Sequence, residues 1–133
     1  MDEEVKVSIE GIPYQVSIAA RDHRWLADEP TDIAGGDTGP NPGELLLSSL
    51  GACTAITLTM YAARKKWPVE KIDIELQFNS AAKPDPLTTV IECRIHFTGN
   101  LDEAQRKRMM EIAHSCPIHK LLTNPVIINT KED

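Results

Sequence analysis

The sequence predicts an α+β fold, and three observations carry that prediction. Apolar and polar side chains alternate in several short runs, such as residues 5–9 and 72–78, which is typical of strands with one buried face. Residues 45–63 form an uncharged run of 19 residues, far too long for a strand, so they indicate one long helix. The predicted strands come in groups instead of alternating with helices, and we therefore expect antiparallel sheets packed around that helix.

The N-terminal part is predicted to hold a hairpin followed by a third strand. Residues 5–9 and 14–18 alternate in polarity, and the turn-forming run Gly11-Ile12-Pro13 separates them. Residues 24–27 extend as a further short strand. The following segment, 28–42, is rich in glycine and proline and predicts a loop.

The long helix has a clear predicted start and end. Asn41 is suited to the N-cap and Pro42 to the first helical position. Glu44 adds negative charge to the first turn, where the helix dipole favours it. The helix should continue to about Lys66, because Pro68 cannot continue it.

Strands and two shorter helices are predicted to follow. Strands are expected at 72–78 and 89–98, with a turn at 81–86 between them. Asn100 or Asp102 should cap a helix over 102–114, and a second short helix should run to about Leu122. A last strand is expected at 126–128.

Length and charge limit the classes of protein to which this chain can belong. A chain of 133 residues is predicted to form a single domain over 1–133. The net charge of −6, with basic residues scattered, argues against a nucleic-acid partner. The acidic N-terminus has no apolar core of the kind a secretory signal needs, so we expect a cytoplasmic protein.

The uncharged run is long enough to cross a bilayer, but its composition favours another reading. Serine, threonine and glycine dilute its hydrophobicity. We therefore expect no membrane partner and interpret the run as the central helix of a core. A helix that is apolar on nearly every side needs wide cover, which a second subunit would supply.

Cysteines are the candidate functional residues. Cys116 precedes a proline at a helix start, where the helix dipole lowers a thiol pKa. His114 and His119 flank it and offer charge or a proton route, although surface histidines are more common. Cys53 lies in the apolar helix, where burial raises the pKa. Cys93 lies in a strand-like run and is interpreted as structural.

Other chemistries fit the sequence less well. Structural zinc prefers paired ligands, whereas this chain has one Cys-x-x-His pair, Cys116 and His119, with Cys53 and Cys93 far upstream. No Gly-x-Ser-x-Gly nucleophile motif is present, and the glycines at 35–39 do not have the order of a phosphate-binding loop. We therefore expect no metal and no cofactor.

Motifs along nearly the whole chain resemble one known family. A helix cysteine is followed about sixty residues later by a Cys-Pro step, and Ala-Asp-Glu-Pro and Gly-Ala-Cys-Thr elements are present. The segments concerned are 27–30, 35–42, 44–54, 60–62, 66–68, 99–102 and 113–119. Together they resemble the OsmC/Ohr family, and the OsmC-like subgroup within it.

The resemblance implies a fold and an activity. The fold is an intertwined homodimer in which antiparallel sheets wrap long buried central helices. The activity is thiol-dependent reduction of organic hydroperoxides, in defence against oxidative stress, with electrons returned by a thiol or dithiol. Cys53 would attack the peroxide and Cys116 would resolve the product as a disulfide.

The resemblance also implies an arginine and a glutamate that activate Cys53. Arg21 is the first choice for the arginine and Arg24 the second. The organic hydroperoxide branch places glutamate directly after the Asn-Pro pair, but that position is Gly43 here and the acid follows at Glu44. One helical residue turns a side chain by about 100°, so Glu44 is predicted to act mainly in the first turn of the helix. The displaced glutamate favours one alternative to a peroxidase, a non-enzymatic redox sensor or small-ligand-binding dimer on the same scaffold. A structural protein with inert thiols is the other alternative.

Overall fold

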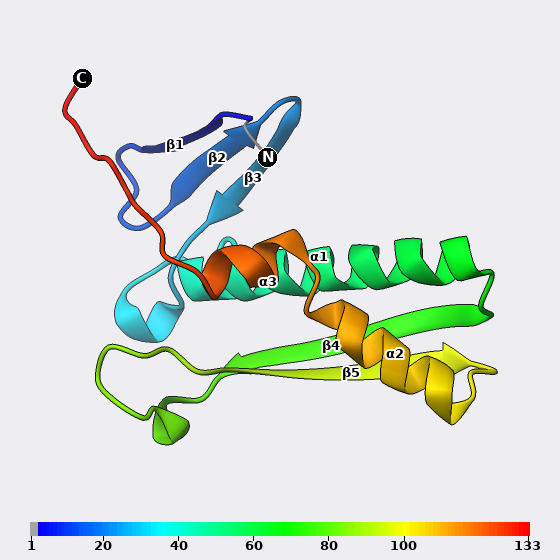
Figure 1. The fold of residues 1–133 in the computed structure, drawn as a ribbon. Coiled ribbons are helices and arrows are strands. Elements are labelled where there is room, and N and C mark those ends of the chain that lie inside the picture. Colours follow the sequence, from blue (N-terminus) through cyan, green and yellow to red (C-terminus); the bar gives the residue numbers. More distant parts are fainter. Residues whose placement is uncertain (1–2) are drawn as a thin grey trace. The chain divides into compact units, whose positions relative to one another are not determined.

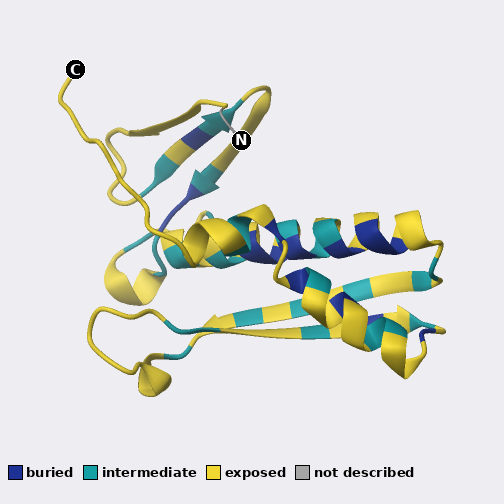
Figure 2. Ribbon diagram, viewed as in Figure 1, coloured by how far each residue is buried: buried dark blue, intermediate teal, exposed yellow. Residues whose placement is uncertain are grey.

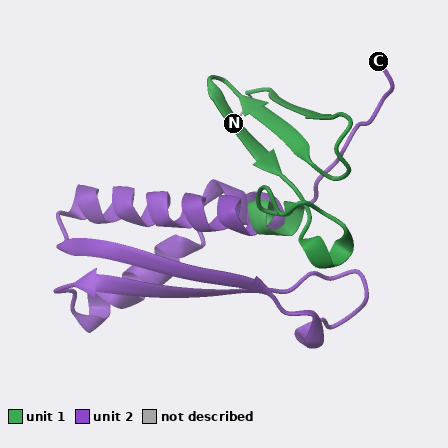
Figure 3. Ribbon diagram, turned by 180° about the vertical axis from the view of Figure 1, so that it is seen from behind, with its two compact units in different colours: residues 1–46 green, residues 47–133 purple. Residues whose placement is uncertain are grey.

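The computed structural model describes residues 3–133, and its mixed helices and antiparallel sheets confirm the predicted α+β class (Figure 1). The described chain divides into two compact units (Figure 3). The first ends at Leu46 and the second comprises Leu47–Asp133.

An antiparallel sheet in the order β1-β2-β3 forms the first unit. Its strands are β1 (Val5–Ile9), β2 (Val16–Ala20) and β3 (His23–Ala27), which confirms the predicted hairpin and third strand. Ile18 is opposite Trp25 in the ladder and is buried, because one face of β2 is covered. Every residue of β1 is exposed in this single chain, including its apolar residues.

Asp28 organises the loop that follows β3. Its carboxylate accepts hydrogen bonds from the Gly36 and Thr38 amides and, at 2.7 Å, from the Thr38 hydroxyl. The residue is only 2% exposed. The Thr38 hydroxyl, together with backbone amides, outweighs the opposing effect of burial and lowers the Asp28 pKa from its ordinary value of 3.8. The loop over 28–38 is therefore held by one ionised side chain.

Replacing Asp28 with asparagine is expected to destabilise this loop in a pH-dependent way. Because the folded pKa is lowered, the stabilisation by Asp28 is fully present above pH 3.8 and is lost as the pH falls through the folded value. We expect Asp28→Asn to lower the thermal midpoint by roughly 4 °C at pH 7. The difference from wild type should shrink below pH 3.8. Thermal unfolding by circular dichroism at pH 7 and pH 3 measures both effects, and a midpoint difference that does not change with pH would contradict this role of the charge.

The long helix begins and ends where the sequence predicts. Helix α1 spans Pro42–Lys65. Asn41 accepts a hydrogen bond from the Glu44 amide at 2.8 Å, and the Glu44 carboxylate accepts one from the Asn41 amide at 2.9 Å. This reciprocal capping box confirms the predicted helix start and gives Glu44 a defined role there. At the other end Lys66 has a φ of 59°, which breaks the helical conformation before Pro68.

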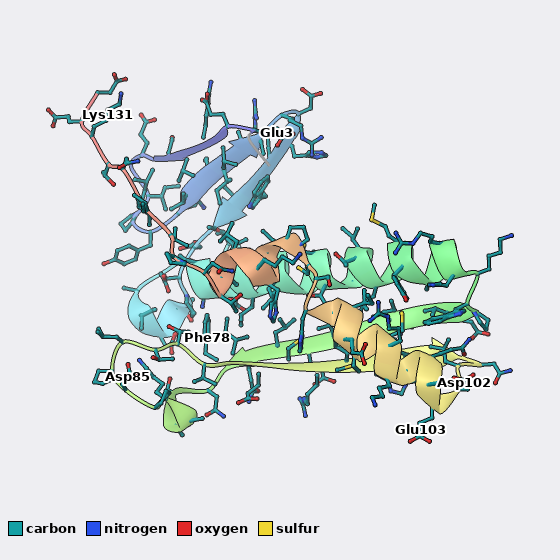
Figure 4. The ribbon with its side chains drawn as sticks, viewed as in Figure 1. Glu3, Phe78, Asp85, Asp102, Glu103 and Lys131 are labelled. Carbon is teal, nitrogen blue, oxygen red and sulfur yellow. The ribbon has the colours of Figure 1, made fainter. Side chains whose placement is uncertain are left out.

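The second unit packs α1 against a long hairpin and two helices. Strands β4 (Val69–Phe78) and β5 (Ile91–Gly99) are antiparallel, and a turn of 3₁₀ helix at Ser80–Ala82 lies between them. Helix α2 (Glu103–Ala113) is capped by Asp102, and α3 (Pro117–Leu122) follows (Figure 4). The observed cap resolves the predicted choice between Asn100 and Asp102. Elements α1, α2 and β5 share a core (Figure 2). Its buried residues are Leu58, Tyr61, Ala62, Phe97, Leu101, Met109 and Ala113.

The prediction of a last strand at 126–128 is wrong for this chain. The structure shows extended, irregular backbone there, and Ile127 and Ile128 are 84% and 80% exposed. The β-branched residues have the right propensity, but no described strand pairs with them. A strand needs a neighbour for its backbone hydrogen bonds, and propensity does not supply one.

Helix α1 is covered only in part by its own chain. By length and composition it could cross a membrane, yet the core helix of a soluble protein passes the same test. Only 28% of its most apolar span is buried. Leu58 and Ala62 face the core, whereas Ile56 and Met60 are 58% and 69% exposed. One face of α1 thus packs in the core and another carries uncovered apolar side chains.

Candidate functional site

Two cysteines that are 63 positions apart in the sequence lie in hydrogen-bond contact. Cys53 lies on α1, and Cys116 is the N-cap residue of α3. The two thiols share a hydrogen bond, and Cys116 Sγ also accepts one from the His119 amide at 3.4 Å. Cys116 is 0% exposed and Cys53 is half-buried. The structure therefore brings together the two thiols that the sequence singled out.

The surroundings push the two thiol pKa values in opposite directions. Burial raises the pKa of Cys53 above its ordinary value of 9.0, and the hydrogen bond and charge of Cys116 raise it further. Burial also opposes ionisation of Cys116, but its hydrogen bonds with Cys53, the His119 amide and Thr54 lower its pKa below 9.0. The pKa of the Cys116 thiol is thus lower than that of the Cys53 thiol, so Cys116 is the first of the two to lose its proton.

Thiolate titration is expected to distinguish the two cysteines. Because the Cys116 pKa is lowered, wild-type protein should develop thiolate absorbance at 240 nm below pH 9.0. In Cys116→Ser the low-pKa thiol is gone, and burial, the largest cause of the raised pKa values of Cys53 and Cys93, remains, so the first titration should move to higher pH. Cys93→Ser serves as the control and should keep the low-pH step. Identical first steps in wild type and Cys116→Ser would contradict this assignment.

A cavity of about 400 Å³ opens beside the thiol pair within the second unit. Its walls come from α1, β5, α2 and α3, and its lining is mostly apolar. The lining residues are Leu50, Thr54, Thr89, Val90, Ile91, Cys93, Ile95, Met110, Ala113, His114, His119, Leu122 and Thr123. Thr54 and His119, which both hydrogen-bond to Cys116, are among them. A small molecule with an apolar body fits such a site.

His114 and His119 form a stacked pair at this cavity. Their ring centroids are 5.0 Å apart and the ring planes are 14° from parallel. Both residues line the cavity beside Cys116. They are therefore placed to contact a molecule that enters it, in agreement with their position next to Cys116 in the sequence.

Three polar contributors to the site were missed by the sequence reading. Thr57 hydrogen-bonds to Cys53, and Thr54 to Cys116. Cys93, interpreted above as structural, lines the cavity, and burial and the negative charge of Cys116 raise its pKa. The sequence held one signal for Cys93, because it shares the alternation of Ile91 and Ile95 and so lies on the same face of β5.

The other predicted site residues belong to the first unit. Arg21 is exposed in the turn between β2 and β3, with a φ of 52°, and Arg24 is exposed on β3. Glu44 takes part in the capping box of α1 described above. The activation of Cys53 by Arg21 or Arg24 stays a prediction. Among residues 3–133 no group of three or more histidines, cysteines or acidic residues is arranged to hold a metal ion.

Similarity to known proteins is found at the level of family and fold. The chain matches the family model of OsmC-like proteins over residues 35–131. No curated protein sequence matches it.

Solved structures share its fold at low sequence identity. An OsmC-like protein from Mycoplasma pneumoniae is 19% identical, with a TM-score of 0.76 over 92% of this chain and 89% of that one. An organic hydroperoxide resistance protein OsmC from Legionella pneumophila is 17% identical, with a TM-score of 0.68 and coverages of 92% and 89%. An organic hydroperoxide resistance protein of Bacillus subtilis is 19% identical, with a TM-score of 0.62 and coverages of 91% and 90%.

Proposed function

This chain belongs to the OsmC-like protein family, and on that premise we propose that it is a thiol-dependent peroxidase that reduces organic hydroperoxides through Cys53 and Cys116. The observation that carries the proposal is the hydrogen bond between the two thiols beside an apolar cavity, whose lining residues Thr54 and His119 both contact Cys116. Fold relatives that are named for organic hydroperoxide resistance favour the same chemistry.

We assign the attack to Cys53, as the family resemblance implies, and propose Cys116 as the group that accepts its proton. The Cys116 thiolate receives the Cys53 proton as Cys53 Sγ attacks the distal oxygen of the hydroperoxide, ROOH. The O–O bond breaks, the alkoxide takes the proton back from Cys116 and leaves as ROH, and Cys53 becomes a sulfenic acid. Cys116, again a thiolate, then attacks Cys53 Sγ, a disulfide forms, and the hydroxyl leaves as water with a proton from solvent, which replaces the one that Cys116 lost when it ionised. Two thiols and one hydroperoxide thus give one disulfide, one alcohol and one water.

A cation beside Cys53 would offset the burial that raises its pKa. We propose Arg21 for this role, with Arg24 as the second choice, since the family resemblance assigns an arginine from this segment. Glu44 is the proposed acidic partner of the arginine, although it already serves the helix cap. A thiol or dithiol reductant that enters the cavity would reopen the disulfide.

The apolar cavity favours organic over hydrogen peroxide. Its lining includes Leu50, Ile91, Ile95 and Met110. These side chains can make apolar contacts with the organic group of a hydroperoxide, which hydrogen peroxide lacks. We propose that the protein acts in the cytoplasm, in defence against oxidative stress. A steady-state assay with tert-butyl hydroperoxide and dithiothreitol tests the proposal, with hydrogen peroxide as the comparison. Sustained turnover that is faster with the organic substrate is expected, and its absence with both oxidants would overturn the proposal.

One observation favours a second candidate, a redox sensor on the same scaffold. Gly43 occupies the position where the organic hydroperoxide branch has glutamate, and Glu44 hydrogen-bonds within the helix cap. A sensor would form the Cys53–Cys116 bond once per peroxide pulse, without sustained turnover in excess dithiol. The steady-state assay therefore separates the two functions.

We also propose that the working form is a homodimer. Ile56 and Met60 on α1 and the apolar residues of β1 and 126–128 are exposed in one chain, and burying them would be favourable. A second copy is the partner that the family resemblance implies.

The dimer predicts a specific effect of charge on α1. Met60→Glu is expected to weaken association at least about tenfold, because a carboxylate would be buried at the interface. Sedimentation velocity over a range of concentrations measures this effect. Leu87→Glu, at a loop position that is 95% exposed, is the matched control and should associate as wild type does. A wild-type protein that stays monomeric at all concentrations would contradict the proposal.

A further inference from the structure

We propose that Cys93 is a third redox thiol of this site, which attacks Cys116 Sγ in the Cys53–Cys116 disulfide and so frees Cys53. The inference rests on the proposed function, because the exchange needs that disulfide as its substrate. It gives a redox role to Cys93, which was interpreted from the sequence alone as structural.

The cavity connects Cys93 to the thiol pair. Cys93 lies on β5 and lines the cavity together with Ile91 and Ile95, the neighbours that share its face of the strand. Thr54 and His119 line the same cavity, and both hydrogen-bond to Cys116. Cys93 therefore lines the same cavity as two residues that contact Cys116.

The sheet register brings Cys93 level with the turn of α1 that carries Cys53. Cys93 is directly opposite Leu76 on β4. Leu76 packs against Gly51, where a Cβ atom would come within 2.8 Å of Leu76 Cδ1. Gly51 thus allows β4 to approach α1 closely, two residues before Cys53. The contact between Gly51 and Leu76 is a second observation, independent of the cavity lining, that the β4–β5 hairpin lies beside the site.

The charge on Cys116 determines when Cys93 can ionise and react. Burial raises the Cys93 pKa, and the negative charge of Cys116 raises it further. An ionised Cys116 therefore opposes the ionisation of Cys93. Once Cys116 is part of a disulfide its charge is gone, and this obstacle to ionisation of Cys93 is removed. The third thiol thus becomes a better nucleophile only after the first disulfide exists.

The exchange is balanced without any further oxidant or reductant. Cys93 loses its proton to solvent, its sulfur bonds to Cys116 Sγ, the Cys53–Cys116 bond breaks, and Cys53 leaves as a thiolate. One disulfide is consumed and one is formed. Cys53 is half-buried and Cys116 is 0% exposed, whereas Cys93 is exposed at the cavity, so the new disulfide presents one sulfur to an incoming thiol reductant. The freed Cys53 can then react with a second hydroperoxide molecule.

Peptide mapping of the oxidised protein tests the exchange. Fully reduced full-length protein receives one equivalent of tert-butyl hydroperoxide without reductant and is quenched at intervals with N-ethylmaleimide. Mass spectrometry of the digest should show the Cys53–Cys116 pair first. The Cys93–Cys116 pair should follow, with alkylated Cys53. In excess hydroperoxide the wild-type chain should consume roughly two equivalents and Cys93→Ser roughly one, since only wild type regains Cys53 after the disulfide forms.

The outcomes separate the exchange from the proposed function. A Cys53–Cys116 bond that forms and persists in wild type would overturn the exchange alone. No disulfide in wild type would overturn the proposed function as well. A Cys53–Cys93 bond would also overturn the exchange as stated, because the attack would then be on Cys53. The wild-type map decides the question even if Cys93→Ser does not fold, and Cys93→Ala provides a second variant for the stoichiometry.

Discussion

Cys53→Ser is expected to reduce hydroperoxide turnover by at least roughly 10³-fold, because it removes the atom that attacks the peroxide. Serine retains a hydrogen-bond donor toward Cys116, so the local structure should survive. The measurement is the steady-state consumption of tert-butyl hydroperoxide with dithiothreitol in excess. Unchanged turnover in this variant would refute the role of Cys53.

Cys116→Ser is the informative companion to that variant. Without the resolving thiol, Cys53 can still react once, and its sulfenic acid should be trapped by dimedone and detected by mass spectrometry. Turnover through the Cys53–Cys116 disulfide should be lost. If Cys53→Ser retains a dimedone-reactive Cys116, the two roles are reversed. That result would agree with the lowered pKa of Cys116 and would show that Cys116 attacks first.

Leu58→Ala is expected to destabilise the folded chain by about 2–5 kcal/mol. Leu58 is 0% exposed and belongs to the core shared by α1, α2 and β5, so the truncation leaves a cavity as well as losing buried surface. Urea unfolding at one fixed protein concentration measures the effect, since association with a second copy would change apparent stability.

A loop leucine gives the matched control for this loss. Leu87→Ala removes the same atoms at a position that is 95% exposed, and it should change stability by no more than about 0.5 kcal/mol. A cost for Leu58→Ala as small as that of the control would contradict the assigned core. Such a result would place the principal core of α1 elsewhere, for example on the face that carries Ile56.

Local patterns in the sequence were sufficient for the elements themselves. The capping residues Asn41 and Asp102 and the stop at Pro68 act over a few residues, so helix boundaries could be predicted to within one or two positions. Alternation identified β4 and β5 for the same reason. The run 126–128 failed because a strand depends on a neighbour, and no local pattern shows whether the chain provides one.

The fold class, the helix boundaries and the two candidate redox cysteines could be predicted from the sequence, because each rests on short-range chemistry or on motifs of a known family. The folded chain was needed to show that Cys53 and Cys116 share a hydrogen bond, that their pKa values move in opposite directions, and that Cys93 lines the cavity beside them. The physical reason is that a thiol pKa depends on burial and on neighbouring donors and charges. Those neighbours come from α1, β5 and α3, which are distant along the chain and meet only when it folds.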